Sequence, residues 1–319
     1  RCLARNPGLL PSLSVTPDPA AAVRIPITGP FGSAGTTLLE GGTLRLPVMP
    51  DTVKRLHELA AKDPKPPAEV ISLLSADPAL SARVMRYANS RKLGFARQIT
   101  TVSQVVMLLG ADKVCNLALG FGLYDSFLSG ESAFSPWEFI GPHGLLTATA
   151  ARLFCQVMGL EATEDEAFMA GMLHDVGRAL LAQERPDIYE RVVQRENDGE
   201  NLLTLEKELF GTDHAVVGAR AAREWALPNS LIQAIAHHHQ PEDVPVGSLP
   251  AIIAAASDLA HASETKRPVP DAAREAMRQW LGIDDGALDK VIQAMIGGAN
   301  PILVSLRPGT DRMGLRQRG

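Results

Sequence analysis

The sequence has few aromatic residues, no excess of basic charge and no long hydrophobic run. Phe, Trp and Tyr together make up 5% of the 319 residues, and the formal net charge is −5. A chain without a basic excess lacks the charge that attracts a phosphate backbone, which argues against nucleic-acid binding as its main role. No apolar run reaches the ~20 residues needed to cross a bilayer, so we expect no membrane association.

Cysteine is also scarce. The three cysteines, Cys2, Cys115 and Cys155, are odd in number and far apart in the sequence, and the last two fall within apolar helical patterns. Disulfide-stabilised secreted domains use even sets of cysteines in oxidising compartments. The cysteine pattern therefore predicts a reducing, cytoplasmic environment.

The chain shows no convincing alternation of apolar and polar residues, which is the pattern typical of strands. Its apolar residues recur instead at helical spacing. Val53, Leu56, Leu59 and Ala60 recur at the period of an α-helix. Prolines such as Pro78 stand at helix starts, where a missing amide proton is harmless. The predicted fold class is all-α.

The same spacing predicts buried positions in the short helices of the N-terminal half. Five aliphatic residues occupy the apolar phase of these helices and are expected in the core: Leu73, Leu80, Val84, Leu108 and Leu109.

Composition divides the chain into four segments. Residues 1–43 are rich in Pro, Gly, Ser and Thr, which predicts an irregular arm or linker. Two helical blocks follow over 44–135 and 136–300, with their junction in the turn-rich stretch 129–136. Residues 301–319 are polar and are expected to be frayed.

Histidines gather in the second block. Besides His261, six histidines lie there: His143, His174, His214, His237, His238 and His239. His174 and Asp175 are adjacent at a helix end, and Asp258 lies on an otherwise apolar helix. Mixed imidazole and carboxylate ligands favour Fe, Mn, Zn or a similar divalent metal.

Each of these residues also has a simpler interpretation. A helix-end histidine often bonds only to its neighbouring carboxylate, Asp258 would face solvent on an ordinary helix, and His214 would be a plain helix-start residue. At least one residue of the triple His237–His239 must be solvated, because consecutive side chains point in different directions. Arg178 would be a cation near a helix C-terminus, favoured by the helix dipole.

An ordered set of short motifs resembles the HDOD domain, a bacterial signalling-output family related to HD phosphohydrolases. The resemblance extends over residues 44–262 and includes the adjacent His174 and Asp175. The motifs, in order, are LPVMP at 46–50, ISLLSADPALSARVMRYANS at 71–90, ITTV at 99–102, LLG at 108–110, NLAL at 116–119, GMLHDVG at 171–177, HAVVG at 214–218, WALP at 225–228 and AIAHHHQP at 234–241.

The resemblance implies an HDOD-type helical module whose second block is similar to the HD phosphohydrolase core. It implies a primary metal set of His143, His174, Asp175 and Asp258. Three more histidines correspond to the ligands that HD-GYP domains use for a second ion: His214, His238 and His239. The expected cofactor is thus one or two divalent ions, and a site that holds no ion stays open as an alternative.

Two departures from the HD-GYP pattern argue against a cyclic-di-GMP phosphodiesterase, and a third concerns the number of metal ions. No Gly-Tyr-Pro loop follows His239, and Arg178 stands where HD-GYP domains have a lysine. Phe139 occupies a position where a carboxylate ligand can occur, which argues against a three-metal centre.

Two classes of function therefore stay open, and a third concerns the metal alone. The favoured one is a regulatory output module that binds a metal, or a small-molecule or nucleotide ligand, and acts on a signalling partner protein. The alternative is a metal-dependent phosphohydrolase, in which Asp175 would bridge the metal and the attacking water while Arg178 binds phosphate. In the third, the metal would only staple the helices together.

Overall fold

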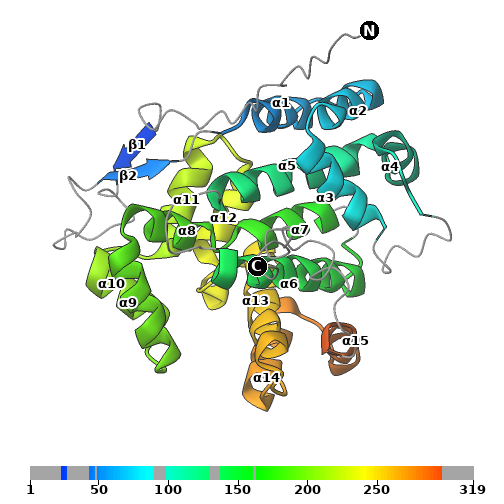
Figure 1. The fold of residues 1–319 in the computed structure, drawn as a ribbon. Helices are drawn as coiled ribbons and strands as arrows, with labels where there is room; N and C mark the ends of the chain where they lie inside the picture. The colour runs from blue at the N-terminus through cyan, green and yellow to red at the C-terminus, as the bar shows by residue number, and fades with distance from the viewer. Residues whose placement is uncertain are drawn as a thin grey trace, which may run out of the picture.

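The computed structural model describes residues 23–26, 43–46, 49–89, 98–128, 137–160 and 163–296. Apart from one short hairpin, these residues form α-helices joined by turns and one 3₁₀ turn, which confirms the predicted all-α class (Figure 1). The expected junction at 129–136 and the tail 301–319 lie outside the described residues. None of the described helices combines the length and apolar character needed to cross a bilayer.

The N-terminal block is built from five helices that lie together at the top of Figure 1. Helix α5 packs against the other four, so their apolar faces meet on it. The helices are α1 (Asp51–Ala60), α2 (Pro67–Ser75), α3 (Pro78–Ala88), α4 (Val102–Leu109) and α5 (Ala111–Leu128).

The second block contains the remaining helices, with α6, α7 and α13 packed together at its centre. Helices α9 and α10 form a projecting pair, and α14 and α15 lie beyond α13 (Figure 1). The elements are α6 (Trp137–Val157), α7 (Glu164–Leu173), α8 (Val176–Glu184), α9 (Pro186–Asn197), α10 (Leu202–Phe210), α11 (His214–Glu224), α12 (Asn229–His237), η5 (Pro241–Asp243), α13 (Leu249–Thr265), α14 (Asp271–Leu281) and α15 (Asp285–Ile296).

A β-hairpin corrects the prediction that the N-terminal segment is wholly irregular. Strand β1 (Val23–Pro26) pairs antiparallel with β2 (Thr43–Leu46). In β2, Leu44 and Leu46 alternate with exposed Arg45 and are 0% and 1% exposed. Strand β2 contacts α8, where the backbone NH of Arg45 donates to Glu184 Oε2 at 3.1 Å. Each strand has only four residues, the shortest run over which alternation indicates a strand in sequence.

The predicted core positions are confirmed on α2 and α3 but not on α4. Leu73, Leu80 and Val84 are buried. Leu109 is half-buried against the core, whereas Leu108 is 53% exposed, so the prediction for Leu108 is wrong. Helix α4 is apolar over most of its surface (VSQVVMLL), so its sequence does not define one inward face.

An aromatic cluster joins the two blocks. Tyr87 of α3 and Phe121 of α5 meet Phe168 of α7 edge to face, with ring centroids 5.6 to 6.2 Å apart. The guanidinium of Arg152, on α6, lies 5.1 Å from the Phe168 ring centroid. Such pairs stabilise beyond their buried area, so we treat Tyr87, Phe121 and Phe168 as the aromatic joint between the blocks.

Both cysteines in the described part of the chain, Cys115 and Cys155, are buried free thiols. Burial raises the pKa of the Cys115 thiol to about 11, so it is a packing residue with little thiolate character.

Candidate metal centre

The ends of several helices bring the candidate ligands together. His174 and Asp175 form the turn between α7 and α8. His214 is the first residue of α11, and His238 directly follows α12. His143 reaches the same region from α6. Residues at helix ends are free of the regular helical spacing, so neighbours such as His174 and Asp175 can face one centre.

Two glycines let these segments approach closely. A Cβ on Gly177 of α8 would lie 1.9 Å from the His214 carbonyl oxygen, and one on Gly171 would lie 2.5 Å from Ala148 Cα. Only glycine allows these backbone contacts. Gly177 therefore sets the distance between the Asp175 turn and the start of α11.

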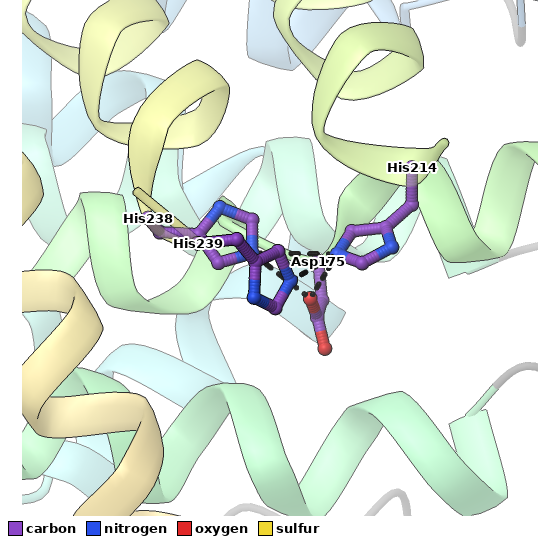
Figure 2. Close-up of side chains that lie close together, drawn as sticks. All are labelled: Asp175, His214, His238 and His239. Atoms are coloured by element: carbon purple, nitrogen blue, oxygen red, sulfur yellow. Dashed lines mark hydrogen bonds and ion pairs between the residues drawn. The ribbon is translucent and has the colours of Figure 1, made fainter. Parts of the chain in front are cut away.

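Three imidazoles surround one carboxylate oxygen. Asp175 Oδ1 lies 3.3 Å from His214 Nε2, 3.5 Å from His174 Nε2 and 3.6 Å from His238 Nε2. Figure 2 shows the histidines of α11 and of the end of α12 facing Asp175 from different sides. His239 is an exposed residue at the rim, and its Nε2 lies 2.9 Å from His214 Nε2.

The other ring nitrogen of each buried histidine is held by an acceptor. His174 Nδ1 donates to the Gly171 carbonyl and His238 Nδ1 to the Ile235 carbonyl, both at 2.8 Å. His214 Nδ1 donates to Glu206 Oε2 at 2.7 Å. This arrangement fixes the tautomers so that the Nε2 lone pairs face the centre, as in metal sites whose ligands are oriented by outer hydrogen bonds.

The unsatisfied atoms at the centre fit a cation. His174 Nε2 is buried without a hydrogen-bond partner among the described residues. His214 Nε2 and His238 Nε2 lie 3.3 Å apart, a contact of two acceptors unless a proton or metal ion lies between them. Burial lowers the pKa of His174 to about 3, so this imidazole is neutral at physiological pH, the form that binds metals.

The charge of the centre is set by two carboxylates. Burial raises the pKa of Asp175, but His174, His214 and His238 outweigh it and hold that pKa well below its usual range. Burial lowers the pKa of His214, yet Glu206 and Asp175 raise it to about 10. Without metal, His214 therefore carries a proton that a bound ion would displace.

The ligands form two sets that share Asp175. In one, His214, His238 and His239 offer atoms within 4.8 Å of one another and of Asp175; in the other, His143 and His174 do so. His143 is held by Ser257 Oγ and Glu264 Oε2, each at 3.1 Å. Two sets that share a carboxylate would have room for two ions, and Asp175 is the residue common to both sets.

Asp258 belongs to neither set. Its side chain is exposed on α13, and Ser257, one residue earlier, is the residue of this turn that meets His143. The position agrees with the simpler interpretation of Asp258 as a solvent-facing carboxylate.

Arg178 lies beside the cluster but is held by other side chains. Its Nε donates to Tyr189 Oη at 3.0 Å and its Nη2 to Glu196 Oε2 at 2.7 Å, while Nη1 lies 3.7 Å from Asp175 Oδ2. These contacts make Arg178 a residue that positions Asp175 rather than a guanidinium open to phosphate.

The sequence prediction missed Glu206, which positions His214. Glu206 is 0% exposed and also accepts from Tyr189 Oη and the His214 backbone NH, both at 2.8 Å. A signal was present, because Glu206 shares the helix face of Leu202, Leu205 and Leu209. A carboxylate within an apolar stripe is costly to bury unless it is paired.

Comparison with known families settles the fold relationship. The model of the HDOD domain matches residues 46–241 of this chain. The chain belongs to the HDOD domain family. The resemblance inferred from the ordered motifs is thus confirmed for this HDOD protein.

Solved structures agree with this assignment. An HDOD domain protein of unknown function from Geobacter sulfurreducens is 25% identical, with a TM-score of 0.67 and coverage of 82% of this chain and 92% of that one. A Shewanella amazonensis protein, provisionally named a phosphohydrolase, is 25% identical with a TM-score of 0.68 and coverage of 82% and 95%.

Curated relatives match smaller parts. An uncharacterised Treponema pallidum protein is 21% identical over 224 residues, which are 70% of this chain and 42% of that protein. Ribonuclease Y of Thermus thermophilus is 29% identical over 139 residues, or 44% of this chain and 18% of the enzyme. This HDOD chain therefore spans less than half the length of either relative.

Proposed function

We propose that this HDOD protein is a metal-binding regulatory output module that acts on a signalling partner protein. The observation that carries the proposal is the convergence of three buried Nε2 atoms on Asp175 Oδ1, with each Nδ1 tied to an acceptor. Imidazole and carboxylate donors suit Fe, Mn, Zn or a similar divalent ion.

The position of the ligands supports a regulatory use of the ion. They come from α6, the α7–α8 turn, α11 and the end of α12, so metal bound at the two ligand sets would tie together segments far apart in sequence. Helix α5 of the N-terminal block packs against both α7 and α8. A movement of the Asp175 turn can therefore reach the N-terminal helices through these direct packing contacts.

The test compares amide hydrogen exchange in metal-loaded and EDTA-treated protein, with metal content measured in the same samples. We expect metal to slow exchange in the α7–α8 turn and α11, and also in α5. If metal slows hydrogen exchange only in the helices that carry the ligands, the metal site does not act on α5. The metal would then only hold those helices together. Absence of bound metal at all concentrations would overturn the metal site itself.

Metal-dependent phosphoester hydrolysis is the second candidate. It is favoured by the exposed rim at His239, which leaves one side of the cluster accessible, and by similarity to proteins named as a phosphohydrolase and a ribonuclease. A bound ion would lower the pKa of a water molecule and polarise a phosphoryl oxygen. Asp175 would orient that water, and Arg178 would hold Asp175.

Hydrolysis is tested with bis(p-nitrophenyl) phosphate and metal-loaded protein. Activity that disappears in Asp175→Asn and in EDTA would support the enzyme. Equal background activity in the wild type and Asp175→Asn would exclude the site as its source.

A further inference from the structure

A groove of about 400 Å³ opens beside the metal cluster, between α10, α11 and α12. Its size is that of a small-molecule site, since such pockets span ~300–1,000 Å³. It is distinct from the buried centre around Asp175 but meets it at His239, which lines the groove.

The charged residues along the groove are mostly basic. Lys207 of α10 and Arg220 and Arg223 of α11 line it, together with a single carboxylate, Asp213. Lys207 Nζ lies 3.2 Å from Asp213 Oδ2, so that carboxylate is already paired with one of the cations. With Lys207, Arg220 and Arg223 against Asp213, the lining carries a net positive charge.

The two arginines lie near one another on the same helix. Arg220 is half-buried and Arg223 is exposed. Burial, and after it the neighbouring charge of Arg223, lowers the pKa of Arg220, so this guanidinium is partly removed from water and lies near a like charge. A guanidinium pair of this kind gains from an anion with several acceptor oxygens, because each group can donate to it in a bidentate way.

The rest of the lining combines apolar and polar surface. Leu203, Ile232 and Ala236 provide apolar area for an organic group. His237 also lines the groove, and its Nδ1 is buried without a hydrogen-bond partner among the described residues. The groove thus offers basic, apolar and hydrogen-bonding surface to one ligand.

We propose that this groove binds a small organic phosphate, such as a nucleoside monophosphate, with its phosphate on Arg220 and Arg223. The inference names the class of signal for the proposed regulatory module and rests on that proposal only for its link to the metal. That link is His239, which lines the groove and whose Nε2 lies 2.9 Å from His214 Nε2 in the cluster.

Isothermal titration calorimetry with adenosine 5′-monophosphate tests the groove, with adenosine and inorganic phosphate as comparison probes. Both EDTA-treated and metal-loaded protein are titrated, and their metal content is measured. We expect the monophosphate to bind metal-free protein, and adenosine and phosphate each to bind at least ~10-fold more weakly. Arg220→Gln and Arg223→Gln should each weaken monophosphate binding ~10-fold, which is the effect of losing one charged hydrogen bond.

Arg191→Gln on α9 is the matched control, since it removes the same charge outside the groove and should leave binding unchanged. Melting curves establish that each variant is folded, and exposed Arg223 keeps the test valid if Arg220→Gln fails to fold. Equal weakening by Arg191→Gln, or equal affinities for the three probes, would overturn the proposal. So would an absence of monophosphate binding.

A further result would also overturn the proposed groove site. If monophosphate binding requires metal and is unchanged in Arg223→Gln, the phosphate binds the ion and not the groove. Failure of the metal proposal alone has a different result: no bound metal, but monophosphate binding that still depends on both arginines.

Discussion

The aromatic joint and the histidine cluster both bring distant helices together in buried surroundings, but they do so by different chemistry. Tyr87, Phe121 and Phe168 pack on one another through ring contacts, with the Arg152 guanidinium over the Phe168 ring. The cluster gathers imidazole nitrogens and a carboxylate, and it leaves His174 Nε2 without a hydrogen-bond partner among the described residues. The joint is stable as it stands, whereas the cluster needs a cation to be fully satisfied. Stability of the joint should therefore be independent of metal, and stability of the cluster should depend on it.

The largest expected effect is at the joint. Phe168→Ala removes a ring that is 2% exposed, which should lower the free energy of unfolding by ~3–5 kcal/mol. Urea unfolding should give the same loss with and without EDTA, because no metal ligand is touched. A loss much larger in metal-loaded protein would show that the joint and the cluster are coupled.

The next effect is at the cluster and appears only with metal. An ion at hundredfold excess over its Kd stabilises the folded state by ~2.7 kcal/mol, and Asp175→Asn should forfeit most of this. EDTA should then lower the melting temperature of the wild type but not that of the variant. Asp258→Asn is the matched control, since exposed Asp258 lies outside both ligand sets, and it should respond to EDTA as the wild type does. An Asp258→Asn variant without an EDTA response would restore Asp258 as a ligand.

A smaller effect is expected from the residue that orients His214. Glu206→Gln replaces an acceptor of three donors by an amide that itself donates, so metal affinity should fall ~10–100-fold. Competition with a fluorescent chelator measures the affinity. Glu208→Gln, on the same helix but paired with Arg195 at the surface, should change it less than ~2-fold. Equal effects of the two variants would contradict the orienting role.

The smallest effect is expected on α4. Met107 is 80% exposed, so Met107→Ser should change the free energy of unfolding by no more than ~0.5 kcal/mol. Val106→Ser, at a neighbouring buried position, should cost several times more in the same urea titration. Similar losses at both positions would mean that Met107 is covered in solution.

The contrast between joint and cluster also explains what the sequence could predict. Helical spacing predicted where the helices lie and predicted that Leu80 and Val84 are buried. It could do so because a helix with one clear apolar face can turn only that face toward the core. It failed at Leu108, because α4 is apolar over most of its surface. The aromatic joint was not predicted, since Tyr87 and Phe168 belong to different blocks and no local pattern pairs them.

The candidate site was predicted in part. The HDOD resemblance supplied His143, His174, Asp175, His214, His238 and His239, and the structure brings all six together in the two ligand sets. It did not supply Glu206, because positioning depends on how α10 packs beside α11. The resemblance also supplied Asp258, which has apolar neighbours in sequence, but this residue belongs to neither ligand set and its side chain is exposed on α13.

If the cluster binds metal as proposed, the contact at Gly177 would limit how its preference among metals could change. Since α8 meets α11 backbone to backbone, larger or smaller side chains cannot alter the gap between Asp175 and His214. The spacing between the backbones that carry Asp175 and His214 is consequently fixed by the main chain. Selection for another ion would have to act by exchanging donor atoms, such as an imidazole for a carboxylate, because sliding the helices is blocked.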